Sequence, residues 1–188
     1  MAEIRKNEAL LEVVDENDFV VRLEKRGIIH QKGLLHREVH IYFLTPHEEI
    51  IFQHRAKNKE ARPDKLDATV GGHVEPGMSY AETAIKECRE ETGLNLHIND
   101  LVFVKKTRSE SFDETTGMTN NVFRTYYAYL YKGDINDLKV EEGKSLGFES
   151  WSIDKLFRLS DKEKERFIPI IISEENLKMI QQIKNQLL

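Results

Sequence analysis

Apolar and polar residues alternate in short runs near the start of the chain. One run is Leu10-Leu-Glu-Val-Val14, and a second begins at Phe19-Val20-Val21, with the polar sequence Asp15-Glu-Asn-Asp18 between them. Runs of this length that are rich in β-branched residues and are separated by turn residues are typical of paired strands. We therefore predict an N-terminal β-hairpin over residues 8–25.

A second pair of strands is predicted at 39–44 and 50–53, on either side of a turn that contains Pro46. The stretch from Arg55 to Lys65 is highly charged and contains Pro63, so we expect an exposed loop there. A short strand is predicted over residues 66–70. The first part of the chain should thus build a sheet from hairpins.

The apolar spacing becomes helical after Ser79. Ser79 and Glu82 stand three residues apart as in a capping box, and Gly93 suits the left-handed residue that ends a helix, so we predict a helix over 80–92. Its apolar positions are Ala81, Ala84, Ile85 and Cys88. One side of this helix should face the core, and the opposite side carries carboxylates.

Strands are predicted again at 101–105, 122–131 and 148–151, and the polar segment 109–121 is predicted to form a loop over a pocket. A short helix is expected at 153–159, and an amphipathic helix at 174–188. A helix placed within a sheet built largely from hairpins predicts an α+β fold, arranged as an α/β/α sandwich, in one domain of 188 residues.

The composition is 39% hydrophobic and 32% charged, without an apolar run near the roughly 20 residues that cross a membrane. The first residues lack the apolar segment of a secretory signal, so we expect a cytoplasmic protein without membrane association. The single cysteine, Cys88, excludes an internal disulfide. The net charge of −5 disfavours nucleic acid as a partner, whereas a small phosphorylated molecule needs only local cations and a metal ion.

Three carboxylates crowd one turn of the predicted helix. Glu87, Glu90 and Glu91 occupy relative positions 0, 3 and 4, which share one side of a helix. Like charges at this spacing repel one another unless a cation lies between them. The pattern therefore indicates a hard divalent cation held by oxygen ligands.

Residues 72–94 resemble the Nudix box, whose pattern is G-x5-E-x7-R-E-U-x-E-E-x-G-U with U apolar. Seven of its nine specified positions are kept, and the departures are Met78 in place of glutamate and Lys86 in place of arginine. The resemblance implies an α/β/α sandwich with a mixed sheet. It also implies that Glu87, Glu90 and Glu91 bind Mg²⁺ or Mn²⁺ with the Gly71 carbonyl, and act as the catalytic residues.

The similarity covers roughly the first two-thirds of the chain and is to the branch of Nudix proteins that includes isopentenyl-diphosphate isomerase. Its further matches lie at 11–17, 33–40 and 67–75. The isomerase pattern has a catalytic cysteine where this chain has Gly71, and a pair of glutamates where it reads Thr119-Asn-Asn-Val122. Without a thiol or an acid at these positions, allylic isomerisation lacks its proton donor and acceptor, so isomerase is the least favoured function.

The remaining chemistry is metal-assisted hydrolysis of a diphosphate linkage in a nucleoside diphosphate derivative. Glu87 and Glu91 are expected to be the main metal ligands, with Glu90 completing the site. The general base is a box glutamate or one from a later loop, where Glu141-Glu142 is an adjacent acidic pair. The alternative is a nucleotide-binding module with weak or no turnover, because Met78 and Lys86 alter the box.

Other residues extend these expectations. Arg55 and His73 are candidates for binding substrate phosphate. A histidine metal centre, as in the isomerase, is an alternative to structural or surface roles for four histidines, and we favour the structural roles. The four are His30, His36, His40 and His73. A homodimer is compatible with the apolar faces of the N-terminal hairpin and the C-terminal helix.

Overall fold

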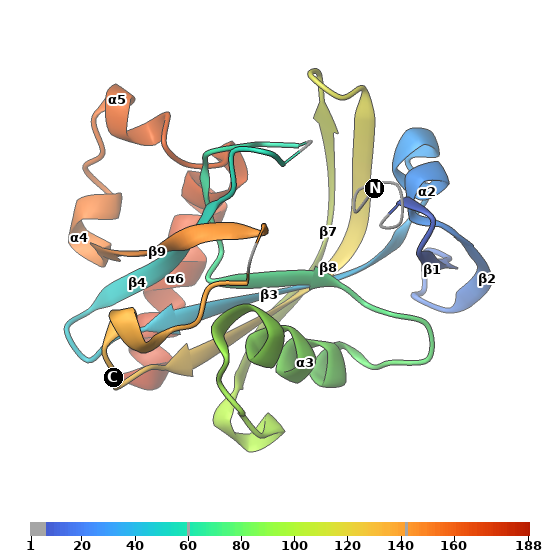
Figure 1. Cartoon of the computed structure of the whole chain (residues 1–188). Coiled ribbons are helices and arrows are strands. Elements are labelled where there is room, and N and C mark those ends of the chain that lie inside the picture. The colour runs from blue at the N-terminus through green and yellow to red at the C-terminus, as the bar shows by residue number, and fades with distance from the viewer. Residues whose placement is uncertain (1–6, 60, 142) are drawn as a thin grey trace.

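A mixed β-sheet forms the centre of the computed structural model, which describes residues 7–59, 61–141 and 143–188 (Figure 1). Its path runs β5-β4-β3-β8-β7, with β6 paired to β3 and β9 paired to β4. The strands are β3 (His36–Leu44), β4 (Glu49–Arg55), β5 (Leu66–Asp67), β6 (Val70–His73), β7 (Val102–Asp113), β8 (Met118–Leu130) and β9 (Ser145–Ser152). β3 and β8 run parallel along their length, and the other pairs are antiparallel, as predicted for a mixed sheet.

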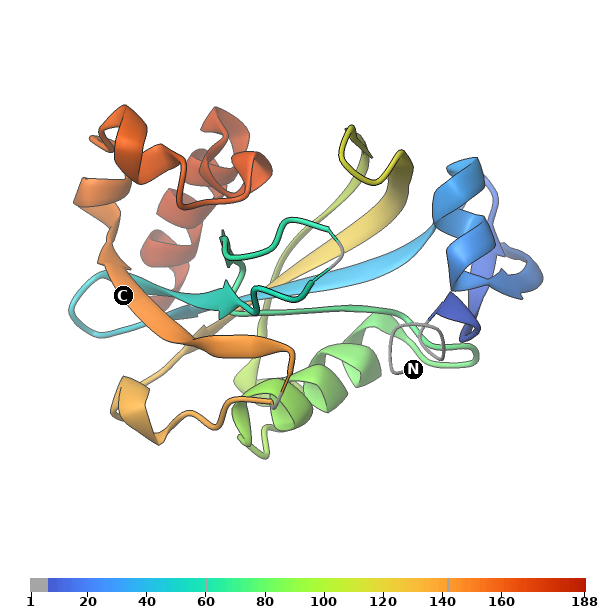
Figure 2. The same ribbon diagram turned by 45° about the horizontal axis from the view of Figure 1, so that its top comes forward.

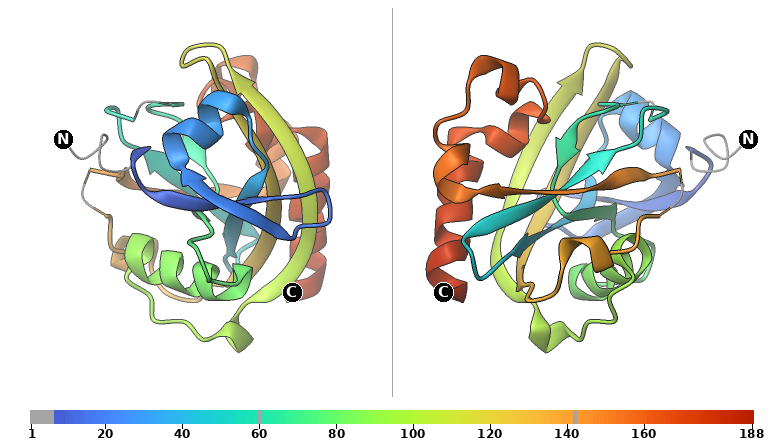
Figure 3. Two further views of the ribbon diagram at one scale, coloured as in Figure 1. Left: turned by 90° about the vertical axis from the view of Figure 1, so that its right-hand side faces the viewer. Right: turned by 60° about the vertical axis from the view of Figure 1, so that its left-hand side comes forward.

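Two helices cover opposite faces of this sheet, α3 (Tyr80–Thr92) on one side and α6 (Glu174–Leu187) on the other (Figures 2 and 3). Neighbouring residues of β3 point to opposite faces, because side chains alternate along a strand. Tyr42 packs in the cluster that contains Ile180 of α6, whereas Phe43 packs in the cluster that contains Cys88 of α3. The α/β/α sandwich is confirmed.

The N-terminal hairpin is also confirmed, and it forms a separate two-stranded sheet of β1 (Leu10–Val14) and β2 (Val20–Lys25). A helix that we did not predict follows it, α2 (Arg26–Lys32). This helix has no side-chain cap and contains a glycine, so its sequence carries little helical signal. It buries Ile29 and His30 beneath the hairpin.

The predicted loop over residues 109–121 is wrong. β7 continues to Asp113 and β8 starts at Met118, so the two strands form one long hairpin that turns at residues 114–117. Many of its outer residues are exposed or half-buried and polar, which is why the sequence resembled a loop. The prediction failed because a strand that extends beyond the core does not need apolar residues.

The strand predicted at 66–70 is divided into β5 and β6 by Thr69. The Thr69 hydroxyl is buried between β3 and β4, where it accepts a hydrogen bond from the Phe43 N–H at 2.9 Å and donates one to the Ile51 carbonyl. The side chain thus supplies bonds that a sheet ladder would otherwise provide. The chain bends at this point and carries β6 along β3.

The remaining helices are short. They are η1 (Ile98–Asp100), η2 (Ile135–Asp137), α4 (Ile153–Leu156), α5 (Asp161–Lys164) and η3 (Pro169–Ile172). The helix expected at 153–159 therefore ends earlier than predicted. The helices at 80–92 and 174–188 are confirmed, and α3 has the expected capping box between Ser79 and Glu82 and a left-handed Gly93. No helix in the described residues is both long and apolar enough to span a membrane.

Candidate active site

A cavity of about 850 Å³ opens between β6, the α3 carboxylates, the loop after β4 and the β7–β8 hairpin. This volume falls within the range of ligand-binding pockets. Segments far apart in the sequence line it, including Glu87 and Glu91 of α3, Gln53 of β4, Gly71 of β6 and Lys144. The predicted site residues Arg55, His73 and Glu90 also line it.

Glu87 and Glu91 lie one turn apart on α3 and are 8% and 6% exposed. Glu90 points toward solvent, although it reaches the rim of the cavity. Glu87 can approach the sheet because Gly72 has no side chain. A Cβ at Gly72 would lie 2.7 Å from the Glu87 Cγ, so any other residue would force the Glu87 side chain to move.

Burial of the two carboxylates disfavours their charged forms. It raises the pKa of Glu91 to about 8, and the nearby Glu87 carboxylate adds to this effect. Burial also raises the pKa of Glu87, although Lys86 and Lys144 oppose the shift. The pair is therefore a site where a cation would relieve both desolvation and repulsion.

Two groups hold Glu91 in position from the sheet. The Gln53 side-chain amide donates a hydrogen bond to Glu91 Oε2 at 3.0 Å, and the Gly71 N–H lies 3.4 Å from the same oxygen. Gln53 is 7% exposed. We had not predicted Gln53, because one glutamine in a strand carries no recognisable signal.

Lys86 lies among three carboxylates on the solvent side of α3. Its ammonium group is 3.0 Å from Glu75 Oε1, 3.0 Å from Glu90 Oε2 and 3.7 Å from Glu87 Oε1. Partial burial acts to lower the pKa of Lys86, but the hydrogen bonds to Glu90 and Glu75 raise it overall. Met78, which replaces the first glutamate of the box, packs against the core beside α3. Among the residues that precede α3, Glu75 instead supplies a carboxylate to Lys86.

Lys144 brings a second cation to the cavity. Its ammonium group pairs with Glu141 at 2.7 Å, and its charge partly opposes the rise in the pKa values of Glu87 and Glu91. Glu141 belongs to the acidic pair that we considered for the general base, and Glu142 lies outside the described residues. The role of Glu141 as a base stays a prediction.

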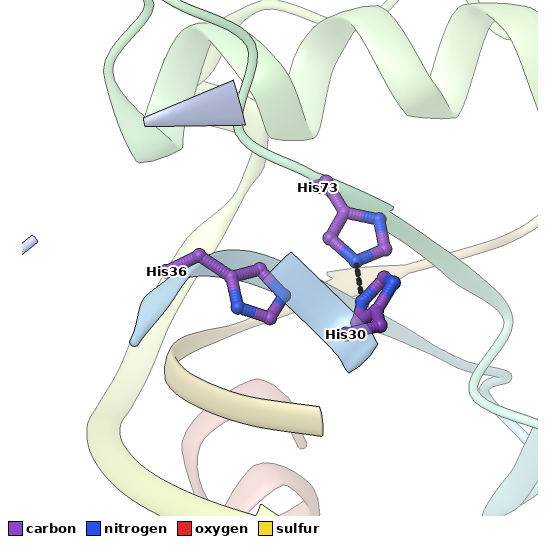
Figure 4. Close-up of side chains that lie close together, drawn as sticks. All are labelled: His30, His36 and His73. Carbon is purple, nitrogen blue, oxygen red and sulfur yellow. Dashed lines mark hydrogen bonds between the residues drawn. The ribbon is translucent and has the colours of Figure 1, made fainter. Parts of the chain in front are cut away.

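Three of the four candidate histidines come together beside the cavity, which His30 and His73 line while His36 is buried behind them (Figure 4). The possible ligand atoms of His30, His36 and His73 all lie within 4.8 Å of one another, and His30 Nε2 is 3.1 Å from His73 Nε2. Burial lowers the pKa values of all three, that of His30 to about 3, so the imidazoles are neutral. Neutral imidazole is the form that binds metal ions.

The orientation of His36 also suits a metal ligand. Its Nδ1 lies 2.9 Å from the Leu34 carbonyl and must donate to it, which leaves the lone pair on Nε2. That buried Nε2 has no hydrogen-bond partner among the described residues. The geometry thus supports the histidine metal centre that we had considered the weaker alternative. His40, the fourth histidine, instead lies 3.2 Å from Glu38.

The isomerase pattern has its pair of glutamates where this chain reads Thr119-Asn-Asn-Val122. Asn120 lies against His30, and its Oδ1, like that of Asn121, is buried without a partner in the described part of the chain. Neutral imidazole nitrogens suit zinc or a similar borderline cation better than Mg²⁺. This end of the cavity therefore differs in ligand chemistry from the carboxylate end.

Arg55 lines the cavity, but its guanidinium is engaged by its own loop and by β5. Its guanidinium donates to the carbonyls of Ala61 at 2.9 Å and Arg62 at 3.1 Å, and it pairs with Asp67 at 3.0 Å. These bonds occupy all three nitrogens and fasten the loop after β4 to β5. Substrate binding by Arg55 stays a prediction, but the geometry shows a loop clamp.

The NUDIX domain family matches residues 34–170, and the chain therefore belongs to the Nudix family. The match includes the box residues Glu87 and Glu91, together with His36 and His73.

Individual relatives fall into two groups. A protein of Clostridium acetobutylicum named as an uncharacterized Nudix hydrolase is 25% identical over 83% of this chain and 76% of its own length. Isopentenyl-diphosphate Delta-isomerase 1 of Aromatoleum aromaticum is 32% identical over 64% of each chain. The chain is thus related both to proteins named as hydrolases and to isomerases.

Solved structures share the fold at low sequence identity. The crystal structure of the protein DR0079 of Deinococcus radiodurans superposes with a TM-score of 0.66 at 20% identity and covers 93% of this chain and 98% of its own. The Nudix domain of NrtR from Shewanella oneidensis, solved with ADP ribose, has a TM-score of 0.56 at 13% identity and covers 93% of this chain and 94% of its own.

Removal of the Gln53 donor should weaken metal binding without unfolding the protein. For Gln53→Met, calorimetric titration with Mn²⁺ should show an affinity about 10- to 100-fold lower than wild type, as is usual for groups that orient metal ligands. Tyr42→Phe is the matched control, because it removes a buried hydrogen bond to Asn176 in the opposite core. Equal Mn²⁺ affinity in Gln53→Met and wild type would refute the role of Gln53.

Glu91 should make the metal-free protein less stable at high pH. Its pKa of about 8 in the folded state exceeds its ordinary value of 4.5, so the folded state holds the proton more tightly and stability falls as pH rises between these values. Glu91→Gln should therefore be more stable than wild type above pH 8, by on the order of a few kcal/mol, and similar to it near pH 4. Urea unfolding with a chelator measures this, and exposed Glu90→Gln should show no such gain.

Proposed function

We propose that the chain is a metal-dependent hydrolase that cleaves a diphosphate linkage in a nucleoside diphosphate derivative. The observation that carries this proposal is the buried pair Glu87 and Glu91, which faces a cavity large enough for such a molecule. Membership of the Nudix family and the relatives named as hydrolases support it. The ADP ribose bound by the Shewanella domain supports a phosphorylated small molecule as the ligand.

Each part of the site would have a distinct role in this reaction. Glu87 and Glu91, with the Gly71 carbonyl, would hold Mg²⁺ or Mn²⁺, and Glu90 would complete the site from the rim. A divalent cation at this position supplies charge neutralisation on the phosphate oxygens and lowers the pKa of the attacking water. Lys144 lies on the same cavity wall and would add a positive charge for the diphosphate.

Isomerase activity is the second candidate, and the histidine cluster favours it together with the isomerase relatives. Two features oppose it. The catalytic cysteine position is Gly71, where a Cβ would lie 3.2 Å from His40 Cδ2, so a larger side chain would be crowded. The glutamate pair of the isomerase pattern falls where this chain reads Thr119-Asn-Asn-Val122, whose side chains cannot accept or deliver a proton at neutral pH. The test is deuterium incorporation from solvent into isopentenyl diphosphate, and we expect none.

A binding module without turnover is the third candidate, because Lys86 lacks the planar fork of arginine. The contacts of Lys86 with Glu75 and Glu90 argue against it, since Lys86 still pairs with carboxylates beside the box. A nucleotide that binds and stays intact over hours would support the module.

The hydrolase test is phosphate or nucleoside monophosphate release from nucleotide sugars, dinucleotides and nucleoside triphosphates with Mg²⁺. Wild type should turn over at least one class, and Glu91→Gln should lower kcat at least about 100-fold by loss of a metal ligand. Glu175→Gln is the control, because it removes an exposed carboxylate from α6 on the opposite face of the sheet. No turnover by wild type, or full activity in Glu91→Gln, would contradict the hydrolase proposal.

A further inference from the structure

The N-terminal hairpin exposes an unusual row of apolar side chains. They are Leu10 at 49%, Phe19 at 69%, Val20 at 48%, Val21 at 59% and Leu23 at 49% exposure. Among the described residues, β2 hydrogen-bonds as a strand to β1 alone. Figure 1 shows β2 at the outer edge of the molecule, and the left view of Figure 3 faces the hairpin.

An exposed apolar edge strand is a template for pairing with another strand. Its backbone N–H and C=O groups on the outer side satisfy one another when a second strand is added. The other apolar surface that we considered for a dimer is not available. Met179, Ile180 and Ile183 of α6 are buried in the core of the chain itself.

We propose that β2 pairs with β2 of a second copy of this chain, antiparallel and about a two-fold axis. The two hairpins would then form one four-stranded sheet in the order β1-β2-β2-β1. Such a contact uses the same surface on both copies and closes after two. It does not depend on the function proposed for the cavity.

The charges of β2 select a second copy as the partner and also select the register. Residues that face each other across two strands have their side chains on the same side of the sheet, and side chains alternate sides along a strand. The two-fold axis must therefore pass through one residue of β2, which then faces its own copy. With the axis at Leu23, Leu23 faces Leu23, and Arg22 faces Glu24 twice. Opposite charges and apolar side chains in direct cross-strand pairs are both favourable.

The neighbouring registers are worse. With the axis at Arg22, two guanidinium groups oppose each other. With the axis at Val21, Glu24 opposes Asp18, and Asp18 is already engaged by Arg37 at 2.6 Å. Like charges directly opposite one another destabilise a sheet. Of these three registers, only the one with its axis at Leu23 places opposite charges in direct pairs.

Among the described residues, Arg22 and Glu24 make only local contacts within the hairpin. The Lys25 N–H donates to Glu24 Oε1 at 3.0 Å, a bond that the added strand would replace. Arg22 and Glu24 are 48% and 26% exposed, and their contact within one strand is long, at 4.0 Å. Lys25 would face Val21 of the second copy. Its ammonium group pairs with Glu8 at 2.5 Å, and its methylene groups are left to cover the Val21 side chain. No other strand of the described chain needs to move.

The test is sedimentation equilibrium over a dilution series of wild type, Arg22→Glu and the double variant Arg22→Glu with Glu24→Arg. Wild type should have the mass of two chains. Arg22→Glu places two pairs of like charges in opposition and should raise the dimer dissociation constant roughly tenfold or more. The double variant exchanges the charges and should restore the dimer.

Thermal unfolding at equal concentration checks that each variant is folded. A monomeric wild type at every concentration overturns the proposal, and cosedimentation with phosphatidylcholine vesicles would then identify a lipid surface as the occupant. Dimerisation unaffected by Arg22→Glu, or lost in it and not restored in the double variant, overturns the register and with it the β2 interface.

Discussion

The repulsion between Glu87 and Glu91, held one helical turn apart and out of water, shapes the candidate active site. Helical spacing brings the carboxylates together, and Gly72 lets Glu87 approach the sheet. Gln53 and the Gly71 N–H donate toward Glu91, and Lys144 places a positive charge nearby. These groups soften the repulsion but leave the pKa of Glu91 near 8, so a divalent cation is the natural completion of the site.

The sheet determines what else reaches this cavity. Thr69 bends the chain between β5 and β6, and β6 then runs along β3. Gly71 and His73 lie two residues apart on β6, so one strand contributes to both the carboxylate end and the histidine end of the cavity. Two donor sets, carboxylates and imidazoles, consequently lie along one strand, and their metal preferences differ.

Local signals in the sequence were sufficient for much of the fold. The capping box and apolar period of α3, the polar turn of the first hairpin and the amphipathic C-terminal helix all act within a few residues, and each was confirmed. Membership of the Nudix family followed from the box. The sequence failed where structure depends on distant partners, as in α2 and in the polar outer part of β7 and β8.

The candidate site shows the same limit. The α3 carboxylates are close in sequence and could be predicted together, whereas His30 and His73 are separated by 43 positions and meet only in the folded chain. The clamp formed by Arg55 depends on two backbone carbonyls of its own loop, and Gln53 matters only because α3 packs opposite it. No pattern of residue types encodes contacts of this kind.

Anomalous diffraction from crystals soaked in Mn²⁺ tests the central claim most directly, because it locates the ion without reference to any substrate. Wild-type crystals should show an anomalous peak between the carboxylates of Glu87 and Glu91, and this peak should be lost in Glu91→Gln. Soaking with Zn²⁺ would show separately whether His30, His36 and His73 hold a second ion. Mn²⁺ density absent from the carboxylate pair in wild type, or unchanged in Glu91→Gln, would contradict a metal site built on these two residues.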